Sequence, residues 1–389
     1  MSPSPEDVQL IIDQVRQFVR REVVPAEQEI EERDEIPPRL VAQAKAMGLF
    51  GFAIPEEYGG LGLSASDEVR LAFELGYTTP ALRSLFGTNN GIAGQVLIKG
   101  GTEEQRRRYL PKLASGEWIA SFALTEENAG SDPAGLQTRA RRTASGWMID
   151  GSKRFITNAP LADVFMVFAR TDPESRDHRG ISAFLVPRNT SGLRVAAKDE
   201  KMGQRGAWTA DVHFDQVEVP GDALVGGPDG EGNGFRIAMR CLSHGRLHIA
   251  ALCVGTARRL VDESVAYAAS RVQGGKPIGE HQLIQALLAD SQTELMAGEA
   301  LVRHVAAQYD AGTDRRLGPS VAKYFCSEMV GRVADRAVQI HGGAGYMRGV
   351  PVERLYRDVR LFRIYEGTSQ IQQLIIGREL VRQAAGRSQ

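Results

Sequence analysis

One glutamate near the C-terminus, Glu366, has neighbours that could hold its carboxylate beside a bound ligand. Gly367 follows it and allows the backbone to turn, while Thr368 and Ser369 are favourable helix N-cap residues ahead of an amphipathic segment. A helix N-terminus of this kind presents amide and hydroxyl donors to a polar or anionic ligand. The stretch is therefore a candidate catalytic loop, although a solvated acid ahead of a capped helix satisfies the same pattern and is the commoner case.

A second stretch that could bind a ligand, residues 123–132, starts as a predicted strand and ends in small residues. Thr125 contributes a hydroxyl and an amide, and Gly130 and Ser131 contribute backbone donors without bulk. Such donors suit a ring carbonyl at one end and a pyrophosphate at the other. A polar β-turn has the same composition, so this stretch alone does not decide between the two.

Two glycine-rich stretches need separate interpretations. Residues 226–234 include two acids and lack the strand and helix context of a nucleotide-binding loop, which favours a flexible crossing between domains. Residues 342–345 follow Gln339 and His341 between two predicted helices. They could let the backbone approach a ligand closely, or they could form a plain interhelical turn.

The composition limits the class of protein and its partners. The chain has 389 residues, of which 42% are hydrophobic and 24% are charged, as expected for a globular protein with two or three domains. Its formal net charge of -1 provides no basic field, which argues against nucleic acid and membrane partners and favours a small molecule. The sequence shows neither an apolar targeting segment nor a run that approaches a membrane span, so we expect a cytoplasmic protein.

The three cysteines, Cys241, Cys253 and Cys326, are odd in number and have no CxxC spacing. They lie in apolar sequence with helical periodicity. This pattern predicts buried thiols in a reducing compartment, with neither disulfides nor a metal site.

Three kinds of sequence follow one another and predict the elements that position these residues. Residues 1–117 have apolar residues at helical spacing, and Thr102 with Gln105 resembles a capping box. Residues 118–228 contain short β-branched and aromatic runs with no helices between them, which predicts an antiparallel barrel or sandwich. Residues 229–389 predict long helices in an antiparallel four-helix bundle. The expected fold class is thus α+β multidomain, with these three parts as domains.

Three separated motifs in this order resemble the acyl-CoA dehydrogenase family. They are ALTEENAGSDPAG at residues 123–135, QIHGGAGYMRGVPVERLYRD at residues 339–358 and YEGTSQIQ at residues 365–372. The first matches the family signature at every constrained position and the second at all but one, while the third resembles the base-carrying segment of short- and medium-chain enzymes. The likeness covers nearly the whole chain, and three motifs together are far more specific than one.

The resemblance implies an FAD-dependent enzyme that desaturates an acyl-CoA thioester to the trans-2-enoyl-CoA, as in fatty acid β-oxidation. Glu366 would abstract the α-proton, and the β-hydride would pass to flavin N5. Burial in a dry pocket makes a carboxylate more basic. The thioester carbonyl needs hydrogen-bond donors, because negative charge develops on its oxygen as an enolate forms. The family further implies a homotetramer built as a dimer of dimers, with an electron-transferring flavoprotein as acceptor.

By position, the resemblance also assigns contacts to the cofactor and the substrate. FAD contacts within one subunit map to Phe122, Leu124, Thr125, Gly130, Ser131, Phe155, Ile156, Thr157, Thr368 and Gln370. A neighbouring subunit would complete the FAD site with Arg271, Gln273, His281, Gln282, Gln339, Ile340, His341, Gly342 and Gly343. Substrate contacts map to Ser131, Ser243, Arg246, Gly367 and Arg378. On residue type alone, Arg246 and Arg271 could instead be surface charges, and Leu124 and Phe155 could be core residues.

Arg83 raises the question of which acyl group is bound. Its position resembles an arginine that holds the distal carboxylate of the substrate in glutaryl-CoA dehydrogenase, so Arg83 is a candidate substrate-binding residue. A solvated or internally paired arginine is the commoner alternative. If Arg83 binds a distal acid, Arg83→Ala should cripple turnover of a dicarboxylyl-CoA and spare butyryl-CoA.

Four positions depart from the family pattern. No carboxylate stands in residues 243–246, where some branches carry the base, so Glu366 is left with that role. Gly274 replaces a usual phenylalanine, which predicts weaker FAD retention. Gly349 replaces a usual acid, which indicates a local structural change, and Phe155 replaces a common tryptophan at the flavin edge.

Two other functions are compatible with parts of this pattern. An acyl-CoA oxidase or flavin monooxygenase relative would release peroxide or hydroxylate its substrate. A non-catalytic acyl-CoA-binding protein would tolerate Glu366→Gln. The retained Glu366 and the flavin motifs favour the dehydrogenase.

Overall fold

The computed structural model of the chain describes residues 3–175 and 177–386. Its first part is helical, and the predicted capping box is present, with Thr102 and Gln105 each bonding the other's backbone amide. A π-helical turn over Val19–Val23 carries the chain directly from the first helix into the second, and Pro25 lies in the first turn of that second helix. The helices are α1 (Pro5–Phe18), α2 (Val24–Arg33), α3 (Pro38–Ala46), α4 (Ala65–Leu75), α5 (Pro80–Gly87), α6 (Ala93–Gly100) and α7 (Glu103–Ala114).

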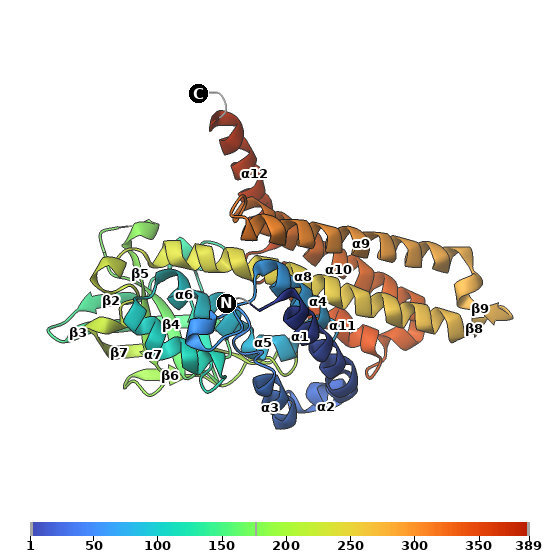
Figure 1. Cartoon of the computed structure of the whole chain (residues 1–389), viewed down its shortest axis with the longest axis horizontal. Helices are drawn as coiled ribbons and strands as arrows, with labels where there is room; N and C mark the ends of the chain where they lie inside the picture. The colour runs from blue at the N-terminus through green and yellow to red at the C-terminus, as the bar shows by residue number, and fades with distance from the viewer. Residues whose placement is uncertain (1–2, 176, 387–389) are drawn as a thin grey trace.

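The middle part is one curled sheet of seven strands, and Figure 1 shows it at one end of the molecule. The strands are β1 (Ala120–Ala123), β2 (Arg139–Arg142), β3 (Gly146–Thr157), β4 (Val164–Arg170), β5 (Ile181–Pro187), β6 (Leu193–Val195) and β7 (Thr209–Pro220). Their order is β1-β4-β2-β3-β7-β6, and β5 pairs with β4 on its own. Most pairs are antiparallel as predicted, but β4 pairs in parallel with β1 and with β2. The sheet is therefore mixed, since β4 enters between two strands that run the same way.

The third part is built from long helices that lie lengthwise beside one another (Figure 1). They are α8 (Gly234–Ser270), α9 (Gln282–Asp310), α10 (Leu317–His341), α11 (Pro351–Val359) and α12 (Ser369–Gly386). A two-stranded hairpin, β8 (Val272–Gln273) and β9 (Lys276–Pro277), joins α8 to α9 at the end farthest from the large sheet. Residues 226–234 are packed tightly and are not a loose linker, since a Cβ at Gly230 would overlap the Val225 carbonyl oxygen.

The helical parts before and after the sheet do not have separate cores. One hydrophobic cluster contains residues of α1 to α5 together with residues of α8 to α11, among them Phe73, Leu82, Leu252 and Val330. The strands have a cluster of their own around Phe165 and Val212. The core shared by the helical parts packs α4, α5 and α8 against one another. These helices carry the polar residues described next.

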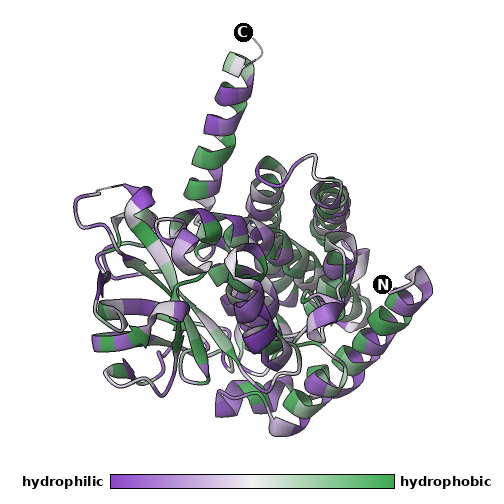
Figure 2. Ribbon diagram, turned by 60° about the vertical axis from the view of Figure 1, so that its left-hand side comes forward, coloured by the Kyte–Doolittle hydropathy of each residue, from purple (hydrophilic) through white to green (hydrophobic). Residues whose placement is uncertain are grey.

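One helix, α12, lies at the edge of this body (Figure 1). In Figures 1 and 2, α12 stands away from the rest of the chain, and Leu374, Leu380 and Val381 are exposed along it. None of the helices in the described ranges is long and apolar enough to cross a membrane. Cys241, Cys253 and Cys326 are buried free thiols, as predicted.

Candidate active site

The Glu366 loop is a strained turn that side chains from three helices hold in place. Glu366 and Gly367 both have positive φ angles, 54° and 89°, between the 3-10 turn at Arg360–Arg363 and α12. Left-handed backbone at a glutamate persists only where its surroundings impose it. Arg246 Nε on α8 donates to the Glu366 carbonyl oxygen at 3.3 Å, and Lys323 Nζ on α10 donates to the Gly367 carbonyl oxygen at 2.7 Å. Gln372 Nε2 donates to both of these carbonyl oxygens, at 3.2 and 2.9 Å.

The side chain of Glu366 points into the protein. Its Oε2 is buried and has no hydrogen-bond partner among the described residues. A Cβ on Gly245 of α8 would lie 2.9 Å from the Glu366 carboxyl carbon and closer still to Oε2, so only glycine at position 245 leaves room for this carboxyl group. Burial raises the pKa of Glu366, although Arg83, Lys323 and Arg246 oppose it. A solvated loop acid is therefore the wrong interpretation of Glu366.

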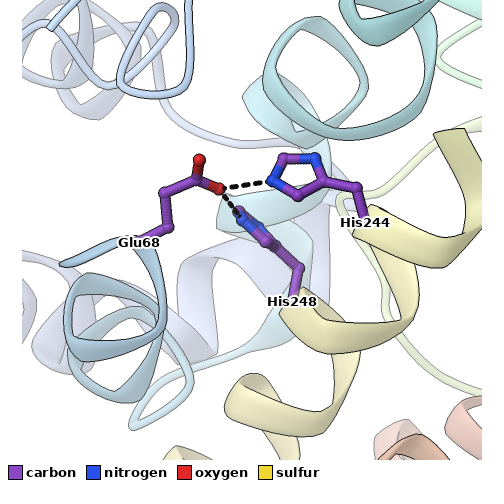
Figure 3. A group of neighbouring side chains, drawn as sticks. All are labelled: Glu68, His244 and His248. Carbon is purple, nitrogen blue, oxygen red and sulfur yellow. Dashed lines mark hydrogen bonds and ion pairs between the residues drawn. The ribbon is translucent and has the colours of Figure 1, made fainter. Parts of the chain in front are cut away.

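A buried polar cluster lies beside this carboxyl group, and we call it the α4–α8 cluster: Glu68, Arg83, His244 and His248. Figure 3 shows both imidazoles directed at one carboxylate oxygen of Glu68, which His244 Nε2 approaches to 2.9 Å and His248 Nε2 also contacts. Arg83 Nη2 bonds His248 Nδ1 at 3.3 Å. Gly245, whose Cβ position lies 2.9 Å from the Glu366 carboxyl carbon, directly follows His244 on α8, and this places the cluster next to the candidate base.

Sequence reasoning missed most of this cluster. The i, i+4 spacing of His244 and His248 on a predicted helix was the available signal, because it puts both rings on one helix face. Glu68 gave no such signal, since it meets them only through the packing of α4 against α8. Arg83 is buried and bonded to His248, so the solvated alternative for this residue is wrong.

The predicted flavin residues of the sheet gather around the end of β3. Arg154 donates its backbone amide to the Thr125 carbonyl oxygen at 2.8 Å, so these two stretches lie side by side. Phe155 is 59% exposed and has a φ of 56° at an irregular point in the β3–β7 pairing. Leu124 and Phe122, in contrast, bury their side chains in the core, and the Phe122 ring lies 4.7 Å from that of Phe168.

The exposed residues at these positions could accommodate a flat cofactor. An exposed aromatic ring held by strained backbone offers a stacking surface, and a Cβ built on Gly130 would meet nothing within 4 Å. Thr157 is half-buried, Ile156 is buried, and Ser131 is exposed beside Gly130. The residues present thus fit a bound flavin: Phe155 and Thr157 could hold its ring, and Gly130 and Ser131 could hold its phosphates.

The FAD residues that were predicted to come from a neighbouring subunit lie at the end of the molecule opposite the large sheet (Figure 1). Gly274 and Gly275 form the turn of the β8–β9 hairpin with positive φ angles, and His281 Nε2 bonds the Gln273 carbonyl oxygen at 3.1 Å. Side chains at Arg271, Gln273, Gln282 and Gln339 are exposed, and Gly342 and Gly343 have open space around them. Ile340 and His341 bury their side chains, and His341 stacks on Tyr267. One chain alone does not bring this group to the sheet (Figure 1).

The predicted substrate residues are also divided. Arg246 is buried and bonded to the Glu366 loop, so its interpretation as a surface charge is wrong. Ser243 is half-buried one residue before His244, whereas Arg378 is exposed on α12. Gln370, a predicted FAD contact, is also exposed on α12. Thr368 Oγ1 accepts from the Ile371 amide at 3.2 Å and caps α12.

The chain folds in the order helices, curled sheet, helices. Its anchored glutamate and an exposed strand end suited to a flavin are features of a flavoenzyme. Comparison with known proteins gives the family. The chain matches the acyl-CoA dehydrogenase N-terminal domain over residues 5–117, the middle domain over residues 121–217 and the C-terminal domain over residues 232–381. The protein belongs to the acyl-CoA dehydrogenase family.

Individual relatives agree with this assignment over nearly full length. An acyl-CoA dehydrogenase of Bacillus subtilis is 41% identical over 94% of this chain and 96% of its own. A caffeyl-CoA reductase-Etf complex subunit of Acetobacterium woodii is 38% identical over 91% and 92% of the two chains. The structure of butyryl-CoA dehydrogenase from Megasphaera elsdenii has a TM-score of 0.92 and 32% identity, covering 98% of this chain and 100% of that one. The protein is an FAD-dependent oxidoreductase of this family.

Proposed function

We propose that Glu366 is the base that removes the α-proton of an acyl-CoA thioester during α,β-dehydrogenation. The observation that carries this proposal is the Glu366 side chain, whose Oε2 is buried without a partner among the described residues and whose loop is fixed by other side chains. A base of this kind needs a raised pKa and a fixed direction. Burial supports the first requirement and the anchored loop supports the second.

The neighbouring residues support the same step. Side chains bond the carbonyl oxygens of Glu366 and Gly367; they come from Arg246, Lys323 and Gln372. The Glu366 backbone amide would donate to the thioester carbonyl oxygen as negative charge develops there. FAD, when bound, supplies a two-electron acceptor at N5 for the β-hydride. Phe155, Thr125 and Thr157 would orient the flavin, while Gly130 and Ser131 would face its phosphates.

The division of the predicted FAD residues between two ends of the chain supports an oligomer. If Arg271, Gln273, His281, Gln282 and the 339–343 segment contact FAD, they must reach it from another subunit. The exposed apolar residues of α12, including Val381 at 71% exposure, are further surface that a second chain could cover. We propose a homotetramer arranged as a dimer of dimers, in which Arg378 on α12 contributes to the CoA site together with Ser243.

The electron acceptor and the location follow from the relatives and the thiols. One relative is named as part of a complex with an electron-transferring flavoprotein, which supports such a flavoprotein as the acceptor here. Three buried free cysteines fit a reducing compartment, and we propose the cytoplasm.

An anaerobic titration of the purified flavoprotein tests the proposed reaction. Addition of saturated acyl-CoA esters of increasing length should bleach the oxidised flavin absorbance for at least one ester, and the product should be the trans-2-enoyl-CoA. Unchanged absorbance with every ester would refute the dehydrogenase. Peroxide formed in stoichiometric amounts on admission of air, with no transfer to an electron-transferring flavoprotein, would favour the oxidase.

A further inference from the structure

The α4–α8 cluster takes no part in the proton abstraction proposed above, although it lies beside Glu366. We propose that this cluster determines acyl specificity and that it selects an acyl group with a hydroxyl group beyond its β-carbon. The inference rests on the proposed function, because it assumes that the acyl chain passes Glu366 and continues toward Arg83 and His244.

The hydrogen bonds fix the tautomer of His248. Arginine can only donate, so the bond from Arg83 Nη2 requires a bare, accepting Nδ1 on His248. The proton of His248 therefore lies on Nε2, which donates it to Glu68. Burial lowers the pKa of His248, which favours this neutral form.

His244 is held in the same way and is left with one free atom. Its Nε2 donates to the Glu68 carboxylate, and its Nδ1 is buried without a partner among the described residues. A proton on that Nδ1 would be a buried cationic donor without an acceptor, which costs more than an unpaired acceptor, so the geometry favours an Nδ1 that accepts. His244 itself is only 4% exposed, so bulk water does not supply that donor.

Arg83 provides the complementary atom. Only its Nη2 has a hydrogen-bond acceptor in the described part of the chain, and its Nε is buried without one. The guanidinium lies over Gly87, where a Cβ would come within 2.8 Å of Nε and Nη1, and its Nη2 lies 3.5 Å from a Cβ position on Gly91. Two glycines thus leave the space that the guanidinium occupies. The cluster offers a ligand both a free donor and a free acceptor.

The charges distinguish a hydroxyl from a carboxylate. Burial works to raise the pKa of Glu68, but its carboxylate accepts from the Nε2–H groups of both imidazoles, and its pKa lies below the ordinary value, so Glu68 is ionised. His248 links Glu68 to the Arg83 cation, and the cluster is neutral as a whole. A distal carboxylate would add negative charge to a buried cluster whose one cation, Arg83, is already balanced by Glu68, and it could not donate to His244 Nδ1. A hydroxyl group can donate to His244 and accept from Arg83 without adding charge.

The same tautomers argue against a metal ion. Glu68, His244 and His248 bring three possible ligand atoms within 4.8 Å of one another. Both Nε2 atoms carry the protons that they donate to Glu68, and the Arg83 cation bonds the far side of His248. A cation would have to displace both protons next to a fixed positive charge.

The test compares CoA esters of matched size on the holoenzyme. The kcat/KM for ω-hydroxyacyl-CoA esters of four to six acyl carbons is measured against alkyl-CoA esters with the same number of heavy atoms and against the dicarboxylyl-CoA esters. At the best length, the hydroxyl ester should exceed the alkyl ester by about 10²-fold, because an alkyl group leaves buried polar atoms unpaired. It should exceed the dicarboxylyl ester as well.

Two variants and one control separate specificity from stability. His244→Leu removes the acceptor and should abolish the preference for the hydroxyl ester. Glu68→Gln leaves Arg83 without its counter-charge and should shift the preference toward the dicarboxylyl ester. Thr256→Val on α8, which loses buried bonds to Gly76 and Leu252 carbonyl oxygens, should keep the preference of the parent protein even if it lowers stability.

Three outcomes would overturn the inference. They are an alkyl ester equal to the hydroxyl ester, a parent enzyme that prefers the dicarboxylyl ester, or an unchanged preference in folded His244→Leu protein. Failure of every ester to reduce the flavin would instead refute the proposed function, so the two failures are distinguishable.

Discussion

Gly245→Ala tests whether the position of Glu366 depends on the missing side chain at residue 245. The added methyl group would lie 2.9 Å from the Glu366 carboxyl carbon, whereas ordinary contact begins at 3.4 Å. The carboxyl carbon must therefore move by at least 0.5 Å, and Oε2, which is nearest, must move further. Catalytic groups are effective within about 0.5 Å of their productive positions, and a misplacement of about 1 Å costs on the order of 10²-fold. We expect kcat/KM to fall by between about 10-fold and about 10²-fold, or about 1.4 to 2.7 kcal/mol in transition-state stabilisation.

Stability should respond differently from activity. Residue 245 lies within α8, where alanine is favoured over glycine by about 1 kcal/mol in a helix interior. The atoms that must yield are the end of one side chain, so the folded protein can absorb the methyl group. Gly377→Ala on α12 is the matched control, because its Cβ would meet nothing within 4 Å. Steady-state kinetics and thermal unfolding of both variants distinguish a displaced Glu366 carboxyl group from a loss of folded protein. A Gly245→Ala enzyme with parental kcat/KM would refute the placement of Glu366, and so would loss of activity that tracks loss of folded protein.

Three further predictions concern the same loop and the hairpin. Lys323→Met removes a cation that lowers the pKa of Glu366, so the acid limb of the kcat/KM profile should move to higher pH; an unmoved limb would show that Lys323 does not act on the base. Glu366→Gln should raise the free energy of unfolding at pH 7. Because the folded pKa of Glu366 is raised, its ionisation penalises the folded state as pH rises above the ordinary value of 4.5, and the gain should shrink as denaturation is repeated toward that pH. Gly274→Phe should increase the fraction of FAD kept through gel filtration, and equal retention would contradict the predicted role of that position.

The long helices and the capping box were predictable because their signals are local. Helix α8 spans Gly234–Ser270 within the stretch predicted to form long helices, because apolar periodicity and the flanking breakers lie within the segment itself. The Glu366 loop was predictable for a related reason. A glycine and two N-cap residues follow the acid directly, and Gly367 does adopt a positive φ angle while Thr368 caps α12.

The features that were missed depend on contacts between distant residues. The shared core of the helical parts and the parallel pairing of β1 with β4 join segments that sequence patterns treat separately. Glu68 meets His248 across 180 positions, so no local pattern could connect them. The residue type of Phe155 was compatible with a core position and with a ligand contact. Only its exposure and its positive φ angle in the structure favour the ligand contact.

The departures at glycines have local explanations in the structure. Gly274 has a φ of 63° in the two-residue turn of the β8–β9 hairpin, and Gly349 has a φ of 92° in an exposed turn before α11. Both are conformations that glycine adopts without strain. Glycine therefore suits the backbone at residue 349, and the local structural change predicted there stays a prediction.

Anaerobic rapid mixing of Glu366→Gln with a substrate ester tests the central claim most directly. Glutamine keeps the size of the side chain and the loop anchors but cannot accept the α-proton. With an ester that bleaches the parent flavin, the variant should still bind, shown by a spectral shift of the oxidised flavin, and its bleaching rate should fall by at least about 10³-fold. Bleaching of the variant at a rate close to that of the parent would contradict the assignment of Glu366 as the base.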